Sequence, residues 1–332
     1  MALPTLVFVP GSWHRPTCYS KIIKLLQEQH HIRCVSVVLA STSGDPNATF
    51  KEDIDAARTA IADETAQGRD VVVVAHSYGG MVGNSAIKGF TRPKDGVPTT
   101  ATSTASQRTD QSASSATTGY VVGLILIASG FTLTGLSFMD PLFGIPPPSW
   151  RVNKESGFAE LVTPPRELFY HDVPADEAEY WVSQLTPQSL KALFDGGEHA
   201  YAGWKNVPVW YIGTIEDHGL PVVIQRVQVG MARGMGGDVE HRELRSSHSP
   251  FLSQPDEVVE IMMDAIAAFT GTLVKVQSVT RFRRHEITVP AANVWQPLSW
   301  FRFGLPLVFG HTIGGTIFVI GWFRGLWRSG SR

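Results

Sequence analysis

The chain has 332 residues, of which 43% are hydrophobic and 17% are charged, and its formal net charge is −2. This composition excludes a disordered chain, and the length suffices for one large domain with an accessory segment. The near balance of 28 basic and 30 acidic residues argues against nucleic acid as a partner. Two cysteines, Cys18 and Cys34, cannot form a disulfide framework, which favours a reducing compartment.

The first apolar run, at residues 6–9, is short, lacks a basic flank and ends at Pro10-Gly11. It therefore predicts a β-strand and not a secretory signal. From this we expect a cytoplasmic protein.

Short apolar runs alternate with amphipathic stretches, which is typical of a mostly parallel sheet flanked by helices. Strands are predicted at residues 6–9, 34–39, 71–75, 121–128, 207–213 and 239–244. Helices are predicted at residues 16–29, 50–67, 79–88 and 255–269. The chain is thus expected to form an α/β domain over residues 1–271.

Two segments interrupt the alternation. Residues 97–119 contain almost no large apolar side chain, so we expect a disordered surface loop. Residues 132–205 combine a proline-rich stretch at 141–148 with helical patterns at 175–185 and 187–194, which predicts a helical cap inserted above the sheet. Such a cap is a natural place for a substrate pocket.

The stretch from Val71 to Gly80 reads VVVVAHSYGG, a buried strand that runs into a turn of small residues and then a helix. This is the context of a nucleophile elbow, in which a strained turn presents the serine hydroxyl above the sheet. Small residues are needed two positions before and after the serine, and Ala75 and Gly79 meet that need. Ser77 is therefore the predicted nucleophile, although a helix-capping serine in an ordinary turn is the simpler alternative.

A nucleophilic serine needs a base and a group that orients the base. The elbow predicts the chain order serine, acid, histidine. Asp217 follows the predicted strand 207–213, and His248 follows the strand 239–244, so both lie at the same edge of the sheet as Ser77. Glu216 is the alternative acid; Asp217 is preferred because adjacent residues in a turn point apart.

Backbone donors are expected around the nucleophile. The oxyanion hole is predicted from the amides of Ser12, on the loop after the first strand, and of Tyr78, directly after the serine. The substrate pocket is predicted to be lined by Gly11, Trp13, His14, Phe131 and Trp181. The expected partner is a small molecule, and the mechanism of such a serine needs neither a metal nor a cofactor.

These motifs resemble the α/β-hydrolase superfamily, and within it the branch of plant methyl esterases and hydroxynitrile lyases with their fungal and bacterial esterase-like relatives. The resemblance rests on FVPGSWHRPTCYSKIIKLL, VVVVAHSYGGMV, VPVWYIGTIEDHGLP and SSHSPFLSQPDEVVEIM. It implies a serine carboxylic ester hydrolase with the triad Ser77, Asp217 and His248. Pro10 departs from the family, which usually has histidine at that position of the loop.

Two other functions stay open at this point. The lyases of this branch place lysine after the catalytic histidine and threonine in the oxyanion loop, whereas this chain has Ser249 and Gly11 there. Some members of the superfamily bind a small molecule with little or no turnover, so a non-catalytic binding protein is the third hypothesis.

The last 61 residues, 272–332, differ from the rest of the chain. They contain eight basic residues and one acid, Glu286, so this tail carries +7 and the preceding residues carry −9. Residues 303–323 include no Asp, Glu, Lys or Arg and are long enough to cross a bilayer as a helix. The tail is interpreted as a membrane anchor or interfacial segment, as an apolar extension packed on the body, or as a poorly ordered appendage. The oligomeric state is not predicted.

Overall fold

The computed structural model describes residues 2–93, 118–271, 287–293 and 295–329. Seven strands form one sheet in the order β10-β9-β8-β4-β3-β1-β2. Its strands are β1 Thr5–Val9, β2 Cys34–Ser36, β3 Val71–His76, β4 Val121–Ile127, β8 Val209–Thr214, β9 Val239–Leu244 and β10 Ile287–Thr288. All neighbours pair in parallel except β10, which is antiparallel to β9. The mostly parallel sheet is thus confirmed.

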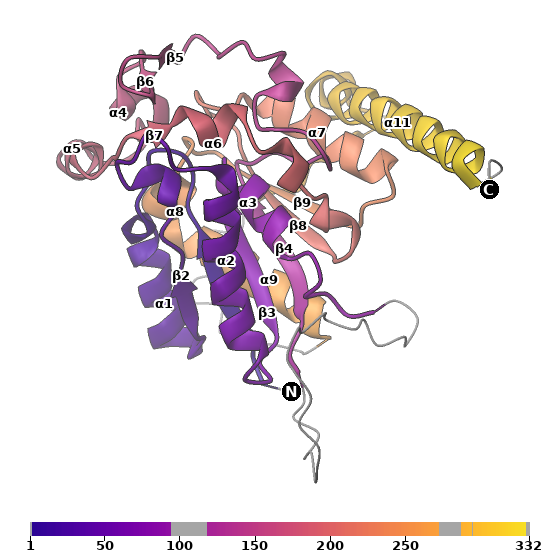
Figure 1. Cartoon of the computed structure of the whole chain (residues 1–332), viewed down its shortest axis with the longest axis horizontal. Helices are drawn as coiled ribbons and strands as arrows, with labels where there is room; N and C mark the ends of the chain where they lie inside the picture. The colour runs from indigo at the N-terminus through magenta and orange to yellow at the C-terminus, as the bar shows by residue number, and fades with distance from the viewer. Residues whose placement is uncertain (1, 94–117, 272–286, 294, 330–332) are drawn as a thin grey trace.

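Helices cover both faces of this sheet (Figure 1). Their bounds are α1 Ser20–His30, α2 Phe50–Thr65, α3 Gly79–Ala86, α7 Val222–Gly234, α8 Pro250–Ser253 and α9 Pro255–Thr270. Side chains alternate along the strands, so Val73 packs with α2, α3 and α7 in one core cluster, whereas Val72 and Val74 pack with α1 and α9 in the other. Burial on both faces explains the continuous run of valines in β3.

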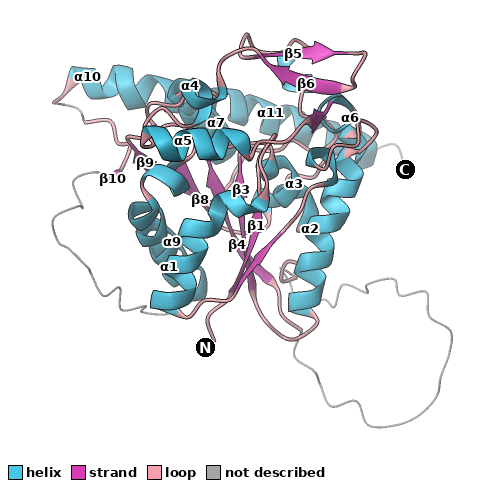
Figure 2. Ribbon diagram, turned by 90° about the vertical axis from the view of Figure 1, so that its left-hand side faces the viewer, coloured by secondary structure: helices cyan, strands magenta, loops and turns pink. Residues whose placement is uncertain are grey.

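The cap lies above the carboxyl ends of the central strands (Figure 2). It contains the short helices α4 Pro165–Phe169, α5 Ala175–Ser183 and α6 Leu190–Phe194. It also contains a three-stranded antiparallel sheet of β5 Trp150–Asn153, β6 Phe158–Leu161 and β7 Gln188–Ser189. The prediction of a helical cap missed this sheet because its strands have only two to four residues. Gln188 and Ser189, expected to be helical, pair with β6.

Three further differences from the predicted elements concern single helices and strands. The strand at 34–39 ends at Ser36, and a helical turn begins at Ala40. The helix at 16–29 opens with a separate 3₁₀ turn, Pro16–Tyr19, before α1. Helix α7 was not predicted, because it starts with β-branched residues and contains Gly230 and Gly234, which all disfavour helix.

The tail forms α10 Pro297–Ser299, a π-helical turn Trp300–Gly304 and the long helix α11 Leu305–Ser329. Helix α11 lies beside α7 and extends past it, at the same end of the molecule as the cap (Figures 1 and 2). The predicted disordered loop at 97–119 falls almost entirely outside the described residues.

Candidate active site

Ser77 occupies a strained turn between β3 and α3. Its φ angle is 52°, in the left-handed region that residues other than glycine rarely adopt. The Ser77 amide donates to the carbonyl of Ile127 at 3.1 Å, and the Ser129 hydroxyl donates to the Ser77 carbonyl at 2.7 Å. The end of β4 therefore holds both sides of the turn, while Ser77 itself stays partly exposed between buried neighbours. This is the backbone geometry of a nucleophile elbow.

Three glycines let other segments approach this turn closely. A Cβ on Gly79 would collide with the carbonyl oxygen of Pro10, and one on Gly80 would collide with the Ser129 hydroxyl. A Cβ on Gly11 would lie 3.0 Å from the Cβ of Ser77. The loop that carries Gly11 and Ser12 therefore passes directly beside the Ser77 side chain.

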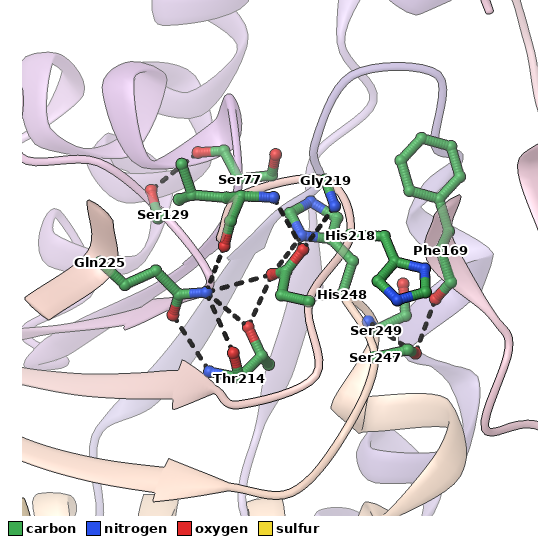
Figure 3. Close-up of polar contacts among 12 residues, drawn as sticks. Ser77, Ser129, Phe169, Thr214, His218, Gly219, Gln225, Ser247, His248 and Ser249 are labelled. Atoms are coloured by element: carbon green, nitrogen blue, oxygen red, sulfur yellow. Dashed lines mark hydrogen bonds and ion pairs between the residues drawn. The ribbon is translucent and has the colours of Figure 1, made fainter. Parts of the chain in front are cut away.

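Asp217 and His248 are in direct contact. The imidazole Nδ1 of His248 lies 2.7 Å from Oδ2 of Asp217, and both side chains are buried. An ionised carboxylate has no hydrogen to donate, so it can only accept in this hydrogen bond. The hydrogen therefore lies on Nδ1 of His248, and Nε2 keeps a free lone pair. Figure 3 shows His248 at the carboxyl edge of the sheet together with Ser77.

His76 connects the elbow to His248. Its Nε2–H donates to the His248 carbonyl at 2.9 Å, and the two rings are 4.6 Å apart. The ring of Phe169, from α4 of the cap, lies 5.7 Å from the His248 ring. The residue before Ser77 and a cap side chain thus both fix the position of the imidazole.

The two candidate acids point in different directions. Glu216 accepts a hydrogen bond from Arg245 at 2.9 Å and is 41% exposed, whereas Asp217 faces His248. Oδ1 of Asp217 accepts the amides of Gly219 and Leu220, both at 2.7 Å. The geometry therefore selects Asp217 as the partner of the imidazole.

Gln225, on α7, was missed by the sequence analysis. Its side-chain amide donates to Oδ2 of Asp217 at 3.2 Å and to the carbonyl of Leu220 at 2.7 Å. Its carbonyl oxygen accepts the Thr214 amide at 3.0 Å. Gln225 thus holds the loop that carries Asp217. The sequence did not point to Gln225, because the helix α7 on which it lies was not predicted.

His14 forms a buried chain of hydrogen bonds beside the elbow. Its Nδ1–H donates to the Ser12 carbonyl at 2.7 Å, so its Nε2 accepts from the Tyr170 hydroxyl at 2.8 Å. Burial lowers the pKa of His14 to about 4, which keeps the ring neutral. Neighbouring Trp13 has a φ angle of 61° and donates from its indole to the Ala159 carbonyl at 3.0 Å. This loop is therefore joined to the cap.

Two of the predicted pocket residues line one hollow in the described part of the chain. His14 and Trp181 line a small, partly open hollow, together with Arg15, Thr17, Cys18, Tyr170, Gln184 and Leu185. Ser77 is not among the residues that line this hollow. Phe131 stacks on Tyr211 and meets Trp204 edge-on in the core. Gly11 lies directly beside the Ser77 side chain. In the described part of the chain, no cluster of three or more His, Cys, Asp or Glu is placed to hold a metal ion.

Acid is expected to destabilise the fold through buried histidines. Burial lowers the pKa of His14 to about 4 and that of His241 to about 3, and it also lowers the pKa of His76. In the unfolded chain these rings take up protons near pH 6.5, so the native state loses stability as the pH falls below that value. Each ring should cost roughly 2 kcal/mol between pH 7 and pH 5. Urea unfolding at the two pH values measures this loss, and His241→Gln should reduce it; equal stabilities at both would contradict the prediction.

Comparison with known proteins identifies the family. The model of the alpha/beta hydrolase family matches residues 6–261, and the chain belongs to this family. A curated relative, the alpha/beta hydrolase nvfD of Aspergillus novofumigatus, is 29% identical over 268 residues, which cover 80% of this chain and 97% of that protein. The predicted fold class is therefore confirmed.

Solved structures agree on the fold. A pyrethroid hydrolase from Sphingobium faniae matches with a TM-score of 0.57 at 18% identity, covering 82% of this chain and all of that chain. Tomato methylketone synthase I, complexed with 2-tridecanone, matches with a TM-score of 0.60 at 14% identity, covering 81% of this chain and all of that one. At these identities the similarity concerns the fold alone. The family match ends before the tail, which starts at residue 272.

Proposed function

We propose that this α/β-hydrolase cleaves a carboxylic ester or lactone by a serine mechanism. The observation that carries the proposal is the left-handed turn at Ser77 beside the buried pair of His248 and Asp217. In this mechanism Nε2 of His248 takes the proton of the Ser77 hydroxyl, and the serine oxygen attacks the ester carbonyl. Asp217 holds the imidazole in the required tautomer.

The acyl-enzyme forms when the alcohol leaves with the proton from His248, and water then releases the acid by the reverse proton transfers. The amides of Ser12 and Tyr78 are proposed to stabilise the negative oxygen of each tetrahedral intermediate. The support for this role is the close approach of the Gly11 loop to Ser77. No metal or cofactor takes part in the proposed reaction.

The surroundings favour a small apolar or aromatic substrate. The ring of Phe169 lies 5.7 Å from the His248 imidazole, and the ring of Trp13 lies 6.0 Å from Phe169 and 6.2 Å from Trp150. Aromatic walls of this kind contribute contact area to apolar groups and offer few hydrogen-bond partners to a sugar or peptide.

A fluorophosphonate probe on the purified full chain tests the proposal. We expect covalent labelling of Ser77, located by peptide mass spectrometry, and hydrolysis of p-nitrophenyl esters with a preference for short or aromatic acyl groups. A folded protein that binds a small aromatic ligand but is not labelled would instead be a non-catalytic binding protein. Faster release of aldehyde from a cyanohydrin than of acid from any ester would identify a lyase.

A further inference from the structure

The first half of the tail helix is packed tightly on the body. Helices α7 and α11 run in parallel, and each contributes a pair of glycines four residues apart to the contact. A Cβ on Gly230 or Gly234 would collide with the backbone of α11, and a Cβ on Gly310 or Gly314 would collide with that of α7. The two backbones are therefore in direct contact, as in close-packed helix pairs built on small residues.

Arg226 fixes the start of the same segment. Its guanidinium donates to the Arg302 carbonyl at 2.7 Å and lies 4.6 Å from the centre of the Phe303 ring. It also pairs with the fully buried carboxylate of Glu243 at 2.7 Å. Detaching the tail would leave this buried charge network incomplete, which is costly. The segment from Arg302 to about Gly315 thus belongs to the folded body.

The described part of α11 that extends beyond α7 is shorter than the hydrocarbon core of a bilayer. Gly234, at the end of α7, lies level with His311 and Gly315. Residues 316–329 therefore extend beyond α7, which at 1.5 Å per residue gives about 21 Å. The hydrocarbon core of a bilayer is about 30 Å thick. The stretch Pro297–Ile320 is long and apolar enough to span a membrane by composition. Its residues up to about Gly315, however, are packed against α7 and cannot also span a bilayer.

The side of the tail that faces away from α7 is nevertheless strongly apolar. The large apolar side chains of the described tail residues with at least 36% exposure are Val289, Trp295, Leu298, Trp300, Phe301, Leu305, Val308, Phe309, Ile317, Phe318, Val319 and Ile320. Leu298, Phe301, Leu305, Phe309 and Ile320 recur at helical spacing on the outward side, and we call these five residues the outward stripe. So many large apolar side chains exposed on one helical segment are unusual on a soluble monomer and mark an interaction site.

The polar groups on this side are suited to a lipid surface. The hydroxyls of Thr312 and Thr316 both donate to the helix carbonyl four residues earlier, at 2.9 Å, so they cost little to bury. Residues 287–332 contain no Asp or Glu and four arginines, including Arg302 at one end and Arg324 and Arg328 at the other. Such a distribution complements anionic headgroups.

We propose that the outward stripe and the free end of α11 dock on the surface of an anionic phospholipid bilayer and enter one leaflet without crossing it. The helix acts as an interfacial element that is rigidly joined to the body through α7. Because α11 lies at the same end of the molecule as the cap (Figure 2), docking brings the cap close to the lipid.

Vesicle flotation with the full chain tests the docking. We expect the protein to float with vesicles of phosphatidylcholine and phosphatidylserine, and less with phosphatidylcholine alone. The double variant Leu305→Asp/Phe309→Asp should reduce binding by about tenfold or more, because two adjacent members of the stripe become charged. The matched control Leu3→Asp/Val38→Asp adds the same charge at exposed apolar sites elsewhere and should float like the parent.

Two results would overturn the proposal. The first is failure of the parent chain to float with the vesicles. If sedimentation then shows a dimer that the Leu305→Asp/Phe309→Asp variant cannot form, the outward stripe is a contact between two copies of the chain. The second concerns depth: Ser331→Cys in a Cys34→Ser background should react with an impermeant maleimide added outside the vesicles. Protection of that thiol until detergent is added would show that the helix crosses the bilayer.

Discussion

Replacing Ser77 with alanine should abolish ester turnover, with kcat/KM falling by about a millionfold if Ser77 is the nucleophile. In the proposed mechanism the Ser77 hydroxyl makes the bond to the acyl group. The fold should persist because Ser77 is partly exposed and its turn is held by backbone contacts to Ile127 and by the Ser129 hydroxyl. Steady-state kinetics and a thermal melt measure both quantities.

Ser183→Ala is the matched control for this variant. Ser183 is an exposed serine at the end of α5 whose hydroxyl donates to the Tyr180 carbonyl. Its removal should change kcat/KM by less than about twofold. Substantial turnover in Ser77→Ala, with the same pH profile as the parent, would assign the nucleophile to another residue.

Asp217→Asn should lower kcat by about ten-thousandfold through the wrong tautomer of His248. The carboxylate accepts five hydrogen bonds, from His248, Gly219, Leu220, Thr214 and Gln225. The asparagine side chain of the variant keeps the shape of the carboxylate, but its NH₂ group donates a hydrogen bond. Nδ1 of His248 then becomes the acceptor, and the ring hydrogen moves to Nε2. The imidazole can then no longer take the serine proton.

Glu216→Gln provides the comparison on the adjacent residue. It removes an exposed ion pair with Arg245, which contributes little to stability and has no contact with His248. We expect kcat to change by less than twofold. A larger loss in Glu216→Gln than in Asp217→Asn would make Glu216 the acid and contradict the geometry.

Local patterns predicted the central sheet and the elbow. Four valines before Ala75 indicate a strand buried on both faces, and the small residues after Ser77 indicate a tight turn into a helix. These signals are short-range, because strand burial and turn sterics depend on neighbours within a few residues. For the same reason the candidate serine could be named from sequence, whereas the cap strands of two to four residues were too short to show a period.

Contacts between distant residues decided the rest. That Asp217 and not Glu216 faces His248, that Gln225 holds the acid loop, and that Arg226 binds the tail at Arg302 all depend on chain segments meeting in the fold. The sequence by itself determined the fold class, the order of the candidate triad residues along the chain and the apolar character of the tail. Only the tertiary structure decided that half of α11 is packed on α7. A pair of glycines permits close packing of two helices, but the sequence does not say which helix lies against it.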